Sequence, residues 1–186
     1  MVFLVCQTSA QEKSLSYTIK RDGQSVGSMN IIQVKAGNTI SYKLHSEVKT
    51  KFILTFTAKR IEEAIYNNGV LIYSSVYQNQ NGKEKLSKQM RFDGNKYIVT
   101  DKGTKEQLSN TPIKYNMVCL YTNEPSQINL VFSDKFQKLL PIQKLGEHHY
   151  KISFPDGNFN EYYYSDGTCK RIEVNHSFYS AVMELH

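Results

Sequence analysis

Tight-turn signals divide this chain at short intervals, and they restrict its fold more than any other feature. Eight residue–glycine pairs occur, at 22–23, 36–37, 68–69, 81–82, 93–94, 102–103, 156–157 and 166–167. Asn-Gly and Asp-Gly pairs supply the positive φ angles that two-residue hairpin turns require. The runs between them are rich in Tyr, Ile, Val, Phe and Thr, which favour strands. The pattern predicts a mostly β fold, built as an antiparallel meander.

The predicted strands cover residues 15–21, 25–34, 39–49, 52–59, 62–66, 70–78, 85–92, 96–101, 128–132, 149–154, 158–164, 168–175 and 181–185. Between residues 40 and 58 most even positions are apolar and most odd positions are polar. This alternation is typical of a half-buried antiparallel sheet. We interpret the stretch as one long strand that bends near Thr50, as a curved, open or closed barrel-like sheet requires. Residues 70–77 are apolar on both phases, which predicts a strand that is covered on both faces.

One stretch departs from the β pattern. Thr111-Pro112 resembles a helix N-cap followed by Pro at the first helical position. Apolar residues then recur at helical spacing, which predicts a helix from Pro112 to Tyr121; they are Ile113, Met117, Leu120 and Tyr121. A second short turn is predicted from Ser133 through Phe136, Leu139 and Leu140, and Pro141 would end it. We therefore expect one or two short helices, which would cover an open side of the sheet.

The beginning of the chain predicts export. Residues 1–5 are apolar, and the small residues Thr8 and Ala10 resemble a signal-peptidase site. We interpret residues 1–10 as a remnant signal peptide and residues 11–186 as a single antiparallel β domain of the periplasm or cell envelope. The alternative is a cytosolic N-terminus without a targeting signal. No run of 18 or more apolar residues is present, so the sequence predicts no transmembrane helix.

The composition is that of a globular protein, with 40% apolar and 22% charged residues and a net charge of +6. A basic excess can indicate a nucleic-acid partner. Here the positive charges are 19 Lys and only 4 Arg, spread along the chain. Base and phosphate recognition favours the Arg fork, so we expect a solvated, lysine-rich surface and no nucleic-acid partner.

Two cysteines would remain after loss of a signal peptide that contains Cys6. Cys119 and Cys169 lie 50 residues apart and lack the spacing of a zinc site. In an oxidising compartment they could form a disulfide, and the alternative is two separate buried thiols.

Motifs for catalysis, cofactor binding and metal binding are not found. The sequence lacks a nucleophile elbow, a phosphate-binding glycine loop and the H-E-x-x-H zinc motif. The adjacent His148 and His149 would face opposite sides of a strand and cannot chelate together. We therefore assign no catalytic, cofactor or metal residue, and whether the chain is an enzyme stays open, with a non-catalytic role favoured.

The order of the turn and strand motifs resembles a known group of proteins. The motifs are Tyr17-x-Ile19-x-Arg21-x-Gly23, the Asn68-Gly69-Val70-Leu71 hairpin, Leu120-Tyr121 with Glu124-Pro125, and Pro155-Asp156-Gly157. They resemble exported proteins of unknown function from Bacteroidetes-type bacteria, which implies an exported, curved β domain and supplies no catalytic residue. A looser, fold-level likeness is to the half-barrels of periplasmic lipoprotein carriers, which hold acyl chains.

The sequence thus predicts a non-catalytic domain that binds an apolar or amphipathic ligand, such as an acyl chain. The alternative is a structural or protein-interaction module of the cell envelope whose concave face is filled by its own side chains. The candidate ligand-lining residues are Tyr42, Leu44, Val48, Phe52, Leu54, Phe56, Met117 and Leu120. A wide apolar cavity favours the first function, and a packed interior with an exposed apolar patch or a free sheet edge favours the second.

Overall fold

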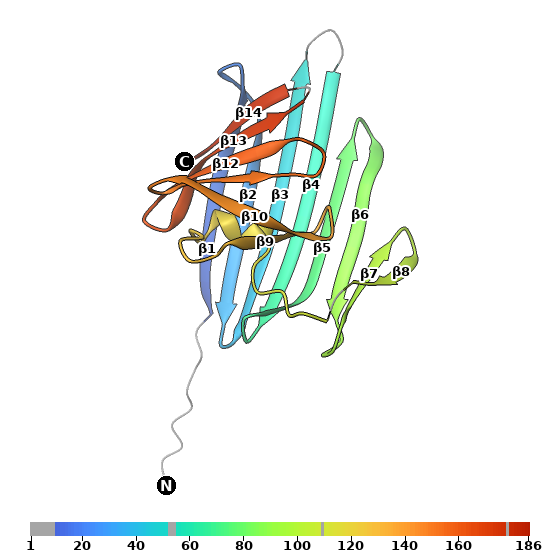
Figure 1. Cartoon of the computed structure of the whole chain (residues 1–186). Helices are drawn as coiled ribbons and strands as arrows, with labels where there is room; N and C mark the ends of the chain where they lie inside the picture. The colour runs from blue at the N-terminus through green and yellow to red at the C-terminus, as the bar shows by residue number, and fades with distance from the viewer. Residues whose placement is uncertain (1–9, 52–54, 109, 178) are drawn as a thin grey trace.

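One antiparallel sheet forms almost the entire molecule. The computed structural model describes residues 10–51, 55–108, 110–177 and 179–186. Six long strands come first and lie side by side in chain order (Figure 1): β1 (Gln11–Arg21), β2 (Gln24–Ala36), β3 (Thr39–Lys51), β4 (Thr55–Asn67), β5 (Val70–Gln80) and β6 (Lys83–Phe92). Shorter elements follow: β7 (Tyr97–Asp101), β8 (Thr104–Gln107), the 3₁₀ helix η1 (Met117–Tyr121), β9 (Leu130–Ser133), β10 (Lys138–Gly146), β11 (His149–Ser153), β12 (Phe159–Ser165), β13 (Thr168–His176) and β14 (Tyr179–Leu185).

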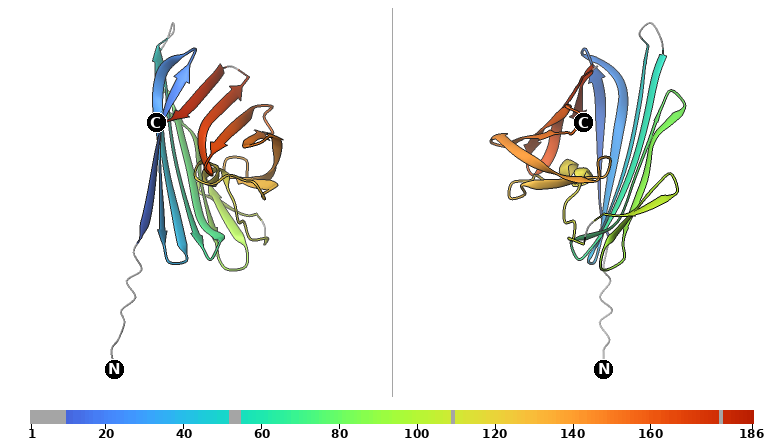
Figure 2. Two further views of the ribbon diagram at one scale, coloured as in Figure 1. Left: turned by 90° about the vertical axis from the view of Figure 1, so that its left-hand side faces the viewer. Right: turned by 45° about the vertical axis from the view of Figure 1, so that its right-hand side comes forward.

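The two halves of the chain are joined through the middle of this sheet. β1 pairs with the last strand, β14, so the order runs from β8 through β1 and β14 to β9. The C-terminal strands curl over one face of the long N-terminal strands (Figure 2), and η1 lies between the two layers. The predicted fold class, a curved and barrel-like antiparallel meander, is confirmed.

The predicted turns are also confirmed. Each of the eight turn glycines has a positive φ, between 57° and 98°, and each joins consecutive strands. In five of these turns the residue before the glycine also has a positive φ, as in Asn68-Gly69 and Asp166-Gly167. A positive φ at both central residues is the geometry that twists a two-residue hairpin correctly.

Between residues 40 and 58 the even positions include the buried side chains, as predicted, but the backbone does not form the single long strand that was predicted. Tyr42 and Leu44 are buried, as expected for the even face. However, the stretch is not one strand bent near Thr50: β3 and β4 are antiparallel partners, and Val48 lies opposite Ala58. Because even-numbered residues face even-numbered ones across this pair, a hairpin and a continuous strand give the same alternation.

Residues 70–77 include apolar side chains at both odd and even positions, but not because the strand is covered on both faces, as was predicted. Leu71 is buried, but the next buried positions are Ser74 and Val76, on the other phase. The register with β4 passes from Leu71 directly to Tyr73, so Ile72 is an extra residue in a β-bulge. A bulge shifts the side-chain phase by one residue, so this strand is not covered on both faces.

The helix predicted from Pro112 to Tyr121 is reduced to the single turn of η1, the only helix among the residues described. Ile113 instead lies in a segment without regular secondary structure: its N–H donates to the Tyr97 hydroxyl, and its carbonyl accepts from the Leu71 N–H. The second predicted turn is present but shorter: Ser133 Oγ accepts from the Phe136 N–H, and the turn covers residues 134–137. Leu139 and Leu140, which were expected to continue it, belong to the hairpin of β9 and β10. No helix in the described part of the chain is long and apolar enough to cross a membrane.

Candidate functional site

The residues predicted to line a ligand cavity mostly belong to the packed core. Tyr42, Leu44 and Leu120 are at most 3% exposed, and they lie in one continuous apolar cluster between the two layers. Val48, Phe56 and Met117 are half-buried. Phe52 and Leu54 lie outside the described residues. The concave face of the sheet is therefore filled by side chains where these residues lie.

Tyrosine side chains account for much of this filling. The hydroxyls of Tyr17, Tyr97 and Tyr164 donate to backbone carbonyls across the interior, at 2.8–2.9 Å. Burial raises the pKa of all three, so these hydroxyls stay protonated and act as donors. A buried Tyr needs such a partner for its hydroxyl. The many tyrosines therefore serve the core and cross-strand pairing.

Cys119 and Cys169 are free, buried thiols in this structure. The Cys119 Sγ lies 3.4 Å from the Tyr66 hydroxyl, whereas the Cys169 Sγ donates to the carbonyl of Arg171. Burial raises the pKa of both thiols. A buried thiol with a raised pKa is a poor nucleophile. The structure therefore has the second of the two arrangements considered from the sequence, two separate buried cysteines.

A polar cluster crosses the interior near η1. The Tyr66 hydroxyl donates to Asn116 Oδ1 at 2.8 Å, and Asn116 Nδ2 donates to Asp134 Oδ2 at 2.9 Å. Burial raises the pKa of Asp134 to about 6, and the nearby Glu62 carboxylate adds to the rise. Glu62 is itself ion-paired with Arg60 on the same strand. This cluster ties the β9–β10 hairpin to the segment before η1 and to the sheet.

An apolar groove of about 600 Å³ lies outside this core, beside β9. One wall is Leu108 and residues 111–115, which lead from β8 to η1, and the other is formed by residues 127–130, Phe132 and residues 137–139. Two bonds hold the walls in place: the Leu71 N–H donates to the Ile113 carbonyl, and the Phe132 N–H to the Tyr115 carbonyl. The volume of the groove falls within the usual range for small-molecule sites.

The β9–β10 hairpin is apolar on both of its faces. Val131 and Leu140 are buried on the core side. Phe132 and Leu139 pair directly on the other side, and Leu130 lies two residues before Phe132 on the same face. Leu130 and Leu139 remain 49% and 52% exposed. These half-exposed leucines form an apolar surface that the fold itself does not cover.

Sequence reasoning missed this groove, although a signal was present. Residues 130–132 and 139–142 are apolar on both phases, and only one face of a hairpin can point to the core. The stretch from Ser133 was interpreted as a helical turn, so the outer face of the hairpin was not considered.

A second hollow, of about 490 Å³, lies where β2 begins, β3 ends and β4 begins. Its lining includes Val48, one of the predicted ligand residues, together with Gly27 and Ala58. A Cβ atom at Gly27 would come within 2.1 Å of the Glu47 carbonyl oxygen, so only glycine allows this approach of β2 and β3. The polar share of this lining makes it a weaker candidate than the groove.

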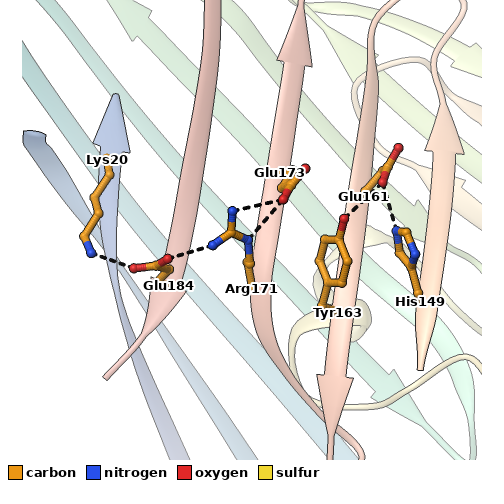
Figure 3. Close-up of polar contacts among 7 residues, drawn as sticks. All are labelled: Lys20, His149, Glu161, Tyr163, Arg171, Glu173 and Glu184. Atoms are coloured by element: carbon orange, nitrogen blue, oxygen red, sulfur yellow. Dashed lines mark hydrogen bonds and ion pairs between the residues drawn. The ribbon is translucent and has the colours of Figure 1, made fainter. Parts of the chain in front are cut away.

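A ladder of charged side chains crosses the C-terminal half on its outer face (Figure 3). Glu184 accepts from Lys20 at 2.6 Å and from Arg171 at 2.9 Å, and Arg171 also pairs with Glu173. Further along, Glu161 accepts from His149 at 2.9 Å and from the Tyr163 hydroxyl at 3.2 Å. The partners lie on neighbouring strands or two residues apart on one strand, and neither hollow includes them. This ladder therefore serves the pairing of strands.

Residues that could hold a metal ion are not gathered anywhere in the described part of the chain, where no three His, Cys, Asp or Glu side chains have suitable geometry. The groove itself offers apolar contact surface, side-chain amides and two lysines, Lys114 and Lys138, but no carboxylate. Such a lining can bind an apolar chain and contains no acid–base pair for catalysis.

Comparisons with known proteins agree with the fold and add no activity. No curated protein matches the chain. A crystal structure of a β-barrel-like protein of the domain of unknown function DUF1849, from Brucella abortus, is similar in fold, with a TM-score of 0.57. It has 9% sequence identity, and the match covers 94% of each chain. The model of a domain of unknown function, DUF6134, matches residues 17–186. The chain belongs to the DUF6134 family.

Proposed function

We propose that this protein is a non-catalytic binding domain for an apolar or amphipathic ligand, such as an acyl chain, and that the ligand lies in the groove beside β9. One observation carries the proposal: Leu130 and Leu139 remain about half exposed within a preformed apolar groove. Fully burying an exposed leucine side chain contributes about 1.5–3 kcal/mol, so covering a leucine that is already half buried contributes about half of that. Binding at this place therefore has a physical driving force.

The test is the binding of a neutral, apolar fluorophore, N-phenylnaphthylamine, to wild-type protein and to two variants. Leu139→Gln places an amide in the groove and should weaken binding roughly three- to tenfold, from the lost burial of the exposed half of one leucine. Leu145→Gln is the matched control, because Leu145 lies on the same strand, is 42% exposed and is not part of the groove. It should bind the fluorophore as the wild type does.

Either of two results would overturn the proposal. One is a wild-type protein that gives no saturable fluorescence increase. The other is an equal affinity in the wild type, Leu139→Gln and Leu145→Gln, which would place the fluorophore elsewhere. Circular dichroism on both variants checks that the fold is retained, since both changes are at exposed positions.

The second candidate function is a structural or protein-interaction module of the cell envelope. The specific observation that favours it is the filled concave face, where Tyr17, Leu44 and Ile172 are at most 1% exposed. The strand β8 is also a sheet edge, paired only with β7. Free edges can accept a strand from another protein. A structural or protein-interaction function is favoured over ligand binding if the fluorophore does not bind.

Export is proposed on the sequence alone, because residues 1–9 lie outside the described part of the chain. The support is the apolar start followed by the small residues Thr8 and Ala10. N-terminal sequencing of the native protein should give Gln11 as the first residue. Intact Met1 in protein from a cytoplasmic fraction would contradict export.

A further inference from the structure

We propose that the ligand of the groove carries an anionic head group, and specifically that it is a carboxylate on a single acyl chain, held between Lys114 and Lys138. This inference rests on the proposed function and names the class of ligand for the same site. Its basis is the charge of the lining: the groove has a lysine on each wall and contains no Asp or Glu.

The two lysines come from different parts of the fold. Lys114 follows Ile113, whose N–H and carbonyl are both bonded to the sheet. Lys138 is the first residue of β10 and precedes Leu139, the half-exposed leucine of the opposite wall. The positions of both backbones are therefore fixed, while both side chains are exposed.

Neither lysine has an ion-pair or hydrogen-bond partner among the residues that the structure describes. By contrast, Lys135, three residues before Lys138, pairs with Asp156 at 3.0 Å. The positive charges of Lys114 and Lys138 are therefore not neutralised by the fold. An anion at the groove would meet two cations and no repelling carboxylate in the lining.

The arrangement fits an amphiphile better than a purely apolar molecule. The floor of the groove is apolar, with Ile113 and Phe132 both at most 6% exposed, and the lysines lie where the lining meets solvent. An acyl chain can occupy the floor while its carboxylate stays in water between the two ammonium groups. Long lysine side chains also cover apolar surface with their methylenes while the charge remains solvated.

The experiment compares three ligands with the same alkyl chain, each displacing N-phenylnaphthylamine at submicellar concentrations. Dodecanoate is anionic, dodecanol is neutral and dodecyltrimethylammonium is cationic. Exposed charge pairs contribute modestly, so we expect dodecanoate to bind about fivefold more tightly than dodecanol, and the cation to bind most weakly. The preference for dodecanoate should shrink at high salt, because exposed charges are screened.

Variants test whether the preference for dodecanoate comes from the two lysines. The double variant Lys114→Gln/Lys138→Gln should bind dodecanoate and dodecanol equally while keeping its affinity for the neutral fluorophore. Lys144→Gln is the matched control, since Lys144 is on the same strand as Lys138 and outside the groove. It should keep the full preference for dodecanoate.

The outcomes separate this inference from the proposed function. Fluorophore binding that depends on Leu139, with no preference between dodecanoate and dodecanol, overturns the anionic head group and leaves the apolar site standing. A preference that survives in the double lysine variant also overturns it. Absence of fluorophore binding overturns the proposed function, and this inference with it.

Discussion

Asp134 gives the sharpest test of the packed interior, because a buried carboxyl group couples folding to pH. Asp134 is 4% exposed, and its Oδ2 accepts a hydrogen bond from Asn116 Nδ2. Its other oxygen, Oδ1, has no hydrogen-bond partner within the described part of the chain. Burial disfavours the charged form and raises the pKa of this group from 3.8 to about 6.

The sign and size of the effect follow from linkage. Because the folded-state pKa is the higher one, the native protein binds the proton more tightly than the unfolded chain. The contribution of the Asp134 carboxyl group to the free energy of unfolding is therefore complete below a pH of about 3.8 and is lost as the pH rises through 6. At roughly 1.4 kcal/mol for each pH unit between the two pKa values, the loss amounts to about 3 kcal/mol.

Asp134→Asn removes the ionisation while keeping an oxygen that can accept from Asn116. The variant should therefore gain about 3 kcal/mol in free energy of unfolding relative to wild type between acid and neutral pH. Urea unfolding followed by circular dichroism, repeated across this range, measures the difference. Comparing the two proteins at each pH cancels the titration of all other groups.

The control is Asp156→Asn, for which the expected sign is opposite. Partial burial acts against ionisation of Asp156, but the bonds from Lys135 Nζ and the Asn158 N–H lower its pKa overall. Wild type should therefore gain stability over this variant as the pH rises. A difference between Asp134→Asn and wild type that is constant with pH would refute the reasoning, because it would mean that the Asp134 carboxyl group is solvated.

Three further predictions concern the same core. Tyr66→Phe leaves the Asn116 N–H without its partner and removes the hydroxyl that donates to Asn116 Oδ1, so it should lower the free energy of unfolding by about 3 kcal/mol in urea; a change below 1 kcal/mol would contradict the buried network. Leu44→Ala should cost about 2–5 kcal/mol and leave fluorophore affinity unchanged; weakened binding would place the ligand in the interior. Cys119 and Cys169 should resist iodoacetamide in the native protein and both react after unfolding without reductant, as mass spectrometry would show; two unreactive sulfurs would indicate a disulfide.

The candidate groove shows where prediction from sequence stopped. Leu130, Phe132 and Leu139 are visible as apolar residues in the sequence, but their common face depends on the pairing of β9 with β10. The opposite wall comes from the segment around Ile113, which lies before η1 and is placed beside β9 by tertiary hydrogen bonds. Hydrogen bonds to Tyr97 and Leu71 hold that segment in an irregular conformation where the pattern predicts a helix. Tertiary contacts of this kind override local propensity.

The fold class and the chain reversals could be predicted from the residues alone. The turn glycines must adopt positive φ values, and the alternating side chains must place one face inward, so both are local properties that the residues carry with them. The tertiary structure selects among alternatives that local patterns do not distinguish: β3 pairs with β4, Ile72 is the extra residue of a bulge, and β1 pairs with β14. It also decided that the concave face is filled, because that depends on how closely the second layer packs against the first.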